Sequence, residues 1–345
     1  MMKKLFLTLK ANIKGSGFNP KTATASFNGA IQKAYYNKYT YQNLNLKGTI
    51  HNGNFNATAV AKDPNLTFDL VSNGSFKGKY PKGKIQLNVD IADLEKLNLH
   101  AGPMKIRGVI DADIQSANID YLNGTLQAHS LSITNAKEQF EIDSIDLIMT
   151  ATAEKNTLLL SSSFLDAEIN GKYTLSKLAS ALSNSIAHYY DSNPKSKKIA
   201  IEKQEFTFKM GIKNNPIVLK LIPELKSLEP IFVEGKYNSQ NDSIVFSAII
   251  PKLIYGDNTI TNAALKIDTK EQALVYQLIV DDIQNPKFQL PYTSISGTVK
   301  NNLVAYSVQL KDAEDKERYL ISGTLKAENG NNEINLDPSK LLLNY

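Results

Sequence analysis

Residues 205–212 read Glu-Phe-Thr-Phe-Lys-Met-Gly-Ile, and apolar and polar side chains alternate over the whole stretch. Successive side chains of a β-strand point to opposite faces of the sheet, so this period of two gathers the apolar set on one face. Residues 105–114 repeat the pattern, with Ile106, Ile110 and Ile114 set against charged neighbours. Similar segments recur along much of the chain, and they predict a long sheet with one continuous apolar face.

Turn signals separate these segments. Asn28-Gly29, Asn52-Gly53 and Asn73-Gly74 stand between alternating stretches. Both residue types tolerate the positive φ of a tight hairpin turn, and their spacing favours antiparallel hairpins over strand-helix-strand units. The sequence therefore predicts a mainly β fold: a long antiparallel sheet, curled into a taco-like groove, with two or three short helices. A sandwich of two sheets that bury their apolar faces against each other gives the same alternation.

One amphipathic helix is predicted at residues 176–190. Leu178, Leu182 and Ile186 recur at a spacing of four and form an apolar stripe, which we expect to plug or line the groove. A basic loop at residues 195–198 follows and favours a division of the chain there. We therefore expect a first groove segment, residues 1–190, that ends in this helix, and a second, residues 199–345.

Residues 216–228 predict a second, shorter helix. Asn215 can cap its first turn, and Pro216 suits the first helical position because its missing N–H is not needed there. Pro223 is expected to kink this helix or to divide it into two turns on either side of a break. A single helical turn is expected at residues 92–98.

Composition excludes several functions. The 345 residues are 42% apolar and carry a net charge of only +5, with both signs interspersed, which argues against a disordered chain and against nucleic-acid binding. There is no cysteine, so disulfides and thiolate chemistry are excluded. The four histidines are isolated in sequence, and no phosphate loop or nucleophile elbow is present. We expect a protein that is not an enzyme and holds no metal or cofactor.

The apolar face is then the candidate functional surface, because rows of aliphatic and aromatic side chains can accept hydrocarbon chains without a specific ligand motif. The candidate groove-lining residues are Ile106, Ile110, Ile114, Ile145, Leu147, Met149, Leu178, Leu182, Ile186, Phe206, Phe208, Met210, Ile212, Val304 and Val308.

Three stretches carry a family resemblance. Residues 91–99 read Ile-Ala-Asp-Leu-Glu-Lys-Leu-Asn-Leu, residues 104–110 read Met-Lys-Ile-Arg-Gly-Val-Ile, and residues 119–126 read Ile-Asp-Tyr-Leu-Asn-Gly-Thr-Leu. An Asp-Leu turn that ends in Leu-Asn-Leu, followed by a glycine-bearing strand, is typical of the TamB family of AsmA-like envelope proteins. The chain resembles an internal piece of such a protein over nearly all of its length.

The resemblance implies a periplasmic protein that is anchored to the inner membrane by a segment outside this chain. It implies conduction of phospholipid acyl chains along the apolar groove towards the outer membrane. It also implies support of outer-membrane protein translocation and assembly with an outer-membrane β-barrel of the TamA type. The alternative function is a surface adhesin or a structural β-rich binding protein. A β-solenoid of that kind should show a fixed repeat, and the chain shows none.

Overall fold

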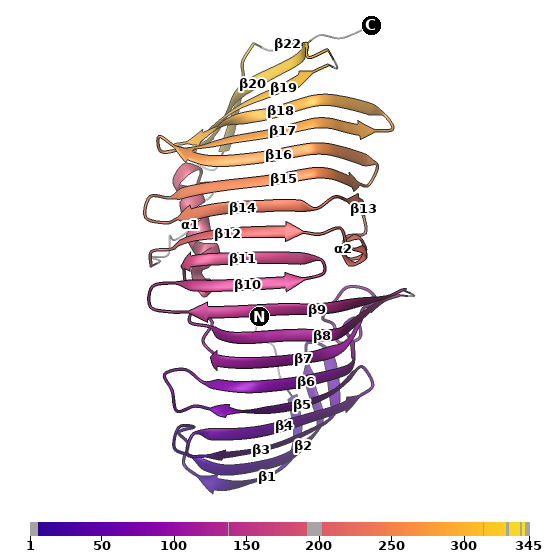
Figure 1. Ribbon diagram of the computed structural model, residues 1–345, viewed down its shortest axis with the longest axis vertical. Coiled ribbons are helices and arrows are strands. Elements are labelled where there is room, and N and C mark those ends of the chain that lie inside the picture. Colours follow the sequence, from indigo (N-terminus) through magenta and orange to yellow (C-terminus); the bar gives the residue numbers. More distant parts are fainter. Residues whose placement is uncertain are drawn as a thin grey trace. The chain divides into compact units, whose positions relative to one another are not determined.

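The computed structural model describes residues 6–136, 138–191, 202–312, 314–328, 331–338 and 340–341. Strands account for 69% of the structure, the sheet is antiparallel, and it does not close on itself. The predicted mainly β, antiparallel class is therefore confirmed. Figure 1 shows the succession of strands within each part of the chain.

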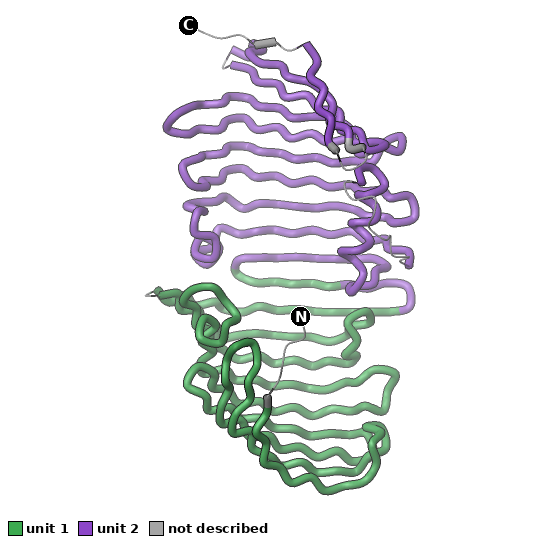
Figure 2. The backbone as a smooth tube through the Cα atoms, turned by 180° about the vertical axis from the view of Figure 1, so that it is seen from behind, with its two compact units in different colours: residues 1–152, 158–163 green, residues 153–157, 164–345 purple. Residues whose placement is uncertain are grey.

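The chain divides into two compact units (Figure 2): unit 1 comprises residues 1–152 and 158–163, and unit 2 comprises residues 153–157 and 164–345. The strands of unit 1 are β1 (Phe6–Ser16), β2 (Thr24–Tyr36), β3 (Tyr39–His51), β4 (Asn54–Asp63), β5 (Leu66–Ser75), β6 (Lys82–Asp93), β7 (Lys105–Ser116), β8 (Asn123–Asn135) and β9 (Glu138–Ala151). Strand β10 (Asn156–Ser162) is divided between the units.

Unit 2 adds three helical elements and the remaining strands. They are β11 (Leu165–Lys172), the 3-10 helix η1 (Leu175–Lys177), α1 (Leu178–Tyr189), β12 (Glu205–Ile212), α2 (Pro216–Leu221), β13 (Leu225–Leu228), β14 (Ile231–Asn238), β15 (Ser243–Tyr255), β16 (Asn258–Lys270), β17 (Ala273–Asn285), β18 (Phe288–Lys300), β19 (Leu303–Lys311), β20 (Glu317–Glu328), β21 (Asn331–Leu336) and β22 (Lys340–Leu341).

Most strands pair with the next strand in the chain, as tight turns dictate. The turn between β3 and β4 has positive φ at Asn52 and Gly53, as the Asn-Gly signal predicts. The turns predicted at Asn28-Gly29 and Asn73-Gly74 are wrong, because these residues are paired inside β2 and β5. Unit 2 departs from the simple order at two points. There β12 pairs with β14 and β13 pairs with the end of β15, and β20 pairs with both β21 and β22.

A line of interrupted pairing crosses four strands of unit 2. The registers of β15–β18 pass over Pro251, Asn262, Asp281 and Tyr292, which lie on neighbouring strands, and we call these four residues the crease. Asn262 has φ 50° there and donates a hydrogen bond from Nδ2 to Oδ2 of Asp281 at 2.9 Å. Irregularities of this kind bend a sheet, and β16–β18 bend in Figure 1.

The crease shifts the side-chain alternation by one residue. On one side of it, the paired apolar-face residues include Ile250, Ala263 and Val280. On the other side, the partly buried apolar residues that pair across the strands are Leu253, Ile260, Ile283 and Leu290. The step from Ile250 to Leu253 is three residues rather than two or four. Because the extra residue is absorbed at the crease, apolar side chains stay on the same face through the bend.

Unit 1 contains comparable irregularities. Asn43 and Ser130 have φ values of 53° and 51° inside β3 and β8, and the registers pass over both residues. The pairings of β6 with both of its neighbours also shift near Asp90. The same solution, one extra residue at a bend, therefore occurs in both units.

The helices of unit 2 confirm one prediction and correct another. The helix predicted at residues 176–190 is present as η1 followed by α1. The helix predicted at 216–228 is wrong in length: α2 ends at Leu221, and Leu225–Leu228 is strand β13. Ile222 precedes Pro223 and is extended, with φ −119° and ψ 93°, because proline disfavours the helical conformation in the residue before it.

Two further predictions about local structure are confirmed. The cap by Asn215 is confirmed, since its side chain accepts a hydrogen bond from the Ile217 N–H at 3.0 Å. The single turn at residues 92–98 is also present, with the Leu97 N–H bonded to the Asp93 carbonyl at 3.0 Å. The basic loop at residues 195–198, where we expected a division of the chain, lies outside the described residues.

Candidate functional site

The apolar face of unit 1 consists of rows of side chains that cross the strands. One row is continuous from β3 to β9, each member paired in register with the next: Leu46, Ala59, Leu70, Leu87, Ile110, Ala128 and Ile145. The neighbouring row ends with Ala112, Leu126 and Leu147, and a third ends with Ile114, Gly124 and Met149. The six candidates that the sequence placed in this unit therefore share one face, with Ile106 paired to Ile133 nearer the bend.

The burial of individual side chains shows whether a second layer packs on this face. Between β4 and β8, most buried positions on the apolar face are small residues, Ala61, Gly108, Ala112, Ser116 and Ala128, and Asp63 is buried at the end of β4. The larger side chains, such as Leu70, remain part-exposed, and Ile85 is 38% exposed. In a two-sheet sandwich these large side chains would be the buried ones. The described part of β4–β8 therefore presents its apolar face without a packed second layer.

Unit 2 has an equally continuous face. One row runs from β11 to β20 through Ala167, Met210, Val233, Ala248, Leu265, Leu278, Ile295, Val308 and Ile321. The candidates Phe206, Phe208, Met210 and Ile212 alternate along β12, and Val304 and Val308 alternate along β19. The registers place all six on this face.

Aromatic rings of unit 2 lie over glycines of the neighbouring strand. Phe208 pairs with Gly235, and a Cβ added to Gly235 would lie 2.5 Å from the Phe208 ring. Tyr276 pairs in the same way with Gly297, and Tyr306 with Gly323. The glycines make room for the rings on the sheet surface, an arrangement known to stabilise strand glycines. Sequence reasoning missed these tyrosines, although a glycine opposite an aromatic residue is a readable signal.

Helix α1 covers one part of the apolar face of unit 2. Its Ala181 is buried in a cluster with Tyr173, Phe206 and Tyr237, and Leu178 and Leu182 pack against the same cluster together with Phe208 and Ile244. Ring centroids lie 5.3 Å apart for Phe206 and Tyr237 and 5.9 Å apart for Tyr173 and Phe206. The prediction that Leu178 and Leu182 face the apolar surface is confirmed.

The stripe predicted for α1 is wrong at Ile186, whose side chain is 51% exposed. The buried residues of the helix are Ala181, Ser185 and Tyr189. Steps of four residues advance about 400° around a helix and drift by roughly 40° each, so a third residue at that spacing leaves the packed side. Steps of four, three and four, as in Leu178, Leu182, Ser185 and Tyr189, follow the helical period instead.

A group of polar contacts, which we call the latch, holds the second half of α1. The Ser185 hydroxyl donates to Oδ1 of Asp242 at 2.6 Å and lies 2.9 Å from the Tyr237 hydroxyl. The Tyr189 hydroxyl donates to the Asp242 carbonyl at 2.7 Å. Beyond the helix end, the Asn302 N–H donates to the Tyr189 carbonyl at 2.9 Å. Burial raises the pKa of Tyr237, so its hydroxyl stays protonated in this contact.

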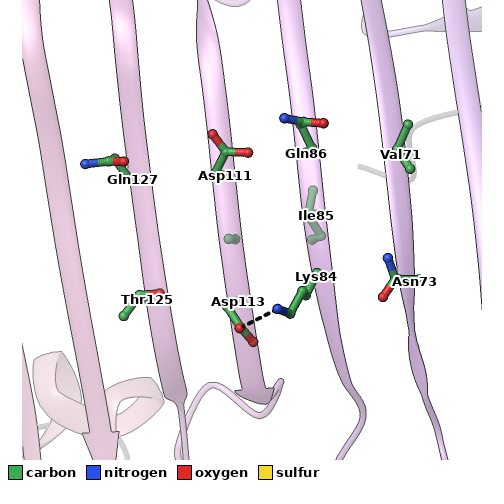
Figure 3. A pocket seen from close by; sticks show the side chains of 10 residues that line it. Val71, Asn73, Lys84, Ile85, Gln86, Asp111, Asp113, Thr125 and Gln127 are labelled. Atoms are coloured by element: carbon green, nitrogen blue, oxygen red, sulfur yellow. Dashed lines mark ion pairs between the residues drawn. The ribbon is translucent and has the colours of Figure 1, made fainter.

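The opposite face of unit 1 is polar and offers a shallow hollow across β5–β8. Figure 3 shows Asn73, Gln86, Asp111 and Gln127 on this side, with Ile85 behind the strand. Lys84 and Asp113 form an ion pair at 3.2 Å with both side chains well exposed, which contributes little to stability. The hollow contains no cluster of groups arranged for catalysis, so the apolar face remains the candidate site.

Two searches within the described residues bear on other site types. They contain no group of three or more side chains placed to hold a metal ion. Among the helices that the structure describes, none combines the length and apolar character needed to cross a membrane.

Comparisons with known proteins give no relative. The chain matches no family model, no curated protein and no solved structure.

Proposed function

We propose that the chain is a segment of a periplasmic bridge-like protein of the TamB or AsmA-like type, and that it conducts phospholipids along its apolar face. In this proposal the sheet of each unit curls about its bend into a taco-like groove with the apolar side inside. The acyl chains lie on the rows of aliphatic residues, and the headgroups stay in water. The parent protein is anchored in the inner membrane, and lipid moves towards the outer membrane.

One observation carries the proposal: along β4–β8, small residues are buried while large apolar side chains stay part-exposed on the same face. A contiguous exposed apolar surface is uncommon in soluble domains and marks a binding surface for apolar partners. The curl has separate support in unit 2, where three residues of the row next to the crease are buried. Ala263 and Val280 are each 5% exposed, and Thr293 is 8% exposed.

The physical benefit of such a face is large. A phospholipid with two acyl chains contains roughly thirty methylenes, and exposing them to water costs on the order of 25 kcal/mol at about 0.8 kcal/mol each. A continuous apolar row removes much of this cost at every step along the path. Conduction needs many similar weak contacts rather than one tight site, and repeated leucine, isoleucine, valine and alanine side chains supply them.

The proposal includes the partner that the sequence resemblance implies. An outer-membrane β-barrel of the TamA type would receive the far end of the parent protein, which would then support outer-membrane protein translocation and assembly. A surface adhesin or structural binding protein is the alternative function. It would use the outer polar surface rather than the apolar rows.

Photo-crosslinking from matched positions tests the proposal. A photoreactive amino acid is placed at Leu87 or Leu278 on the apolar face, or at the adjacent polar-face residues Asn88 or Gln277, and the protein is incubated with phospholipid vesicles. We expect lipid adducts at Leu87 and Leu278 at least tenfold above those at Asn88 and Gln277. The polar-face residues are the more exposed, so non-specific labelling would favour them.

Equal labelling of both faces, or no labelling at any position, would exclude the lipid-conducting function. Charge substitution gives a second test: Met210→Asp should abolish lipid transfer between vesicles, whereas Lys209→Asp, on the opposite face, should not. Circular dichroism of both variants checks that the β structure persists.

A further inference from the structure

Helix α1 occupies a part of the apolar face that differs from the rest in chemistry. Beneath it lie the rings of Tyr173, Phe206 and Tyr237, with Phe208 beside them at a centroid distance of 6.4 Å from Phe206. The side chains that the helix places on these rings are aliphatic, Leu178 and Leu182. Two hydrocarbon side chains of α1 thus lie on an aromatic surface of the sheet.

Few interactions within the helix itself stabilise it. Neither η1 nor α1 has a side-chain hydrogen bond at its N-cap, and neither has an acidic residue in its first turn. Two of its buried residues, Ala181 and Ser185, contribute little apolar surface. Helices of this length are marginal on their own, so α1 depends on the sheet and on the latch for its stability.

The latch is polar and concentrated at one end of the helix. Ser185 and Tyr189 both bond to Asp242, which lies in the turn between β14 and β15, and the Asn302 N–H holds the Tyr189 carbonyl. Each of these hydrogen bonds adds only a modest net stability, because water can satisfy the same groups once the helix has moved away. The helix can therefore leave the aromatic surface without loss of the strand pairings beneath it.

We propose that α1 is a displaceable cover over an acyl-chain site formed by Phe206, Phe208 and Tyr237, and that an acyl chain takes the place of Leu178 and Leu182 when the helix moves. This inference rests on the proposed function and adds a discrete, gated site to the lipid path. A fatty acyl chain carries roughly twice as many apolar carbons as two leucine side chains, so it can bury more hydrocarbon against the same rings. The latch returns the cover once the chain has passed.

A reversible disulfide that fixes α1 on the sheet tests whether the helix acts as a displaceable cover. The chain has no cysteine, so Ser185→Cys with Asp242→Cys introduces a single possible disulfide at side-chain oxygens that lie 2.6 Å apart. Photoreactive residues are placed at Ile244, which packs against the cluster under α1, and at Leu278 on the same face but outside that cluster. The probe is a vesicle of phosphatidylethanolamine and phosphatidylglycerol. Mass spectrometry confirms the disulfide before the labelling is compared.

We expect oxidation to lower lipid labelling at Ile244 at least tenfold and to leave Leu278 unchanged, with recovery at Ile244 after reduction. Redox-independent labelling at Ile244, alongside normal labelling at Leu278, would overturn the cover and leave the proposed function standing. Absence of labelling at both positions in the reduced protein would overturn both.

A second variant needs no disulfide. Tyr189→Phe keeps the ring and removes the hydrogen bonds of its hydroxyl to Asp242 and Thr269. We expect labelling at Ile244 to rise about threefold and amide exchange of residues 178–189 to accelerate. Unchanged labelling and exchange in Tyr189→Phe would contradict a role of the latch in holding the cover.

Discussion

Unit 1 and unit 2 are built from the same alternation but present different apolar faces. The central row of unit 1 is aliphatic, with Phe55 and Phe68 in the flanking rows, and large side chains of this face stay part-exposed between β4 and β8. Unit 2 gathers aromatic rings on β12 and β14 and places α1 on them. A period of two decides which side chains share a face, but their size and the connections between strands decide whether that face is open or covered.

The largest difference between the units should appear in core substitutions. Phe206 is 7% exposed at the centre of the aromatic cluster, so Phe206→Ala should destabilise unit 2 by about 3–5 kcal/mol. Leu87→Ala in unit 1 removes a part-exposed side chain and should cost only about 1–2 kcal/mol. Hydrogen exchange in denaturant, resolved by unit, measures both. Equal losses would show that the face of unit 1 is as tightly packed as the cluster.

Glycine substitutions sharpen the comparison within unit 2. In Gly235→Ala the new Cβ would lie 2.5 Å from the Phe208 ring and 2.6 Å from the Val245 carbonyl, so we expect a loss of about 1–3 kcal/mol. Gly211→Ala is the matched control on the adjacent strand, because the nearest atom to its Cβ is 3.9 Å away. This control should be neutral or slightly stabilising. Thermal unfolding of the two variants measures the difference, and similar melting temperatures would refute close ring–glycine packing.

The two helices of unit 2 differ in how they begin. Asn215 caps α2, whereas α1 has no side-chain cap. Asn215→Ala should therefore cost about 1 kcal/mol and Asn215→Asp much less, since aspartate caps equally well. Amide exchange of Ile217 and Val218 reports on the cap. Identical exchange in the alanine variant and the parent would mean that β13 alone holds α2 in place.

The smallest effect concerns alkaline pH. Burial raises the pKa of Tyr173, Tyr237 and Tyr276 in unit 2 above the usual value of about 10. A raised folded-state pKa gives stability that is complete below pH 10 and is lost as the pH rises through the folded pKa. We expect unit 2 to lose stability above pH 10 and Tyr237→Phe to weaken that dependence. A pH profile of unfolding that is unchanged in Tyr237→Phe would assign the dependence to other groups.

Much of this fold can be predicted from sequence because strand alternation and turn chemistry are local. The face shared by Phe206, Phe208 and Met210 follows from their spacing alone, and the Asn215 cap follows from residue type. What escapes prediction depends on non-local pairing. Residues 225–228 are too few to show a period, and they form a strand because the end of β15 offers an unpaired edge.

The part of the site that sequence missed has similar causes. The sequence does not predict that Ser185 lies on the packed side of α1, because serine is not an apolar residue and so is not counted in an apolar stripe. Its burial is explained by Tyr237 and Asp242, more than fifty residues away in the chain. The crease is also not predictable from one strand. The sequence of residues 250–253 alone does not indicate that β16, β17 and β18 each contain an extra residue at the same place.

The crease limits where such a sheet can tolerate insertions and deletions. Loss of Asn262 alone would bring Ile260 two positions from Ala263 and leave both on the apolar face, but β16 would then lack its residue at the crease while β15 and β17 kept theirs, so its pairing beyond that line would be disrupted. Removal or duplication of a whole hairpin, by contrast, would carry its own compensating residues and leave every row aligned. A protein of this design should therefore vary in length by pairs of strands, and single-residue changes should be confined to its turns.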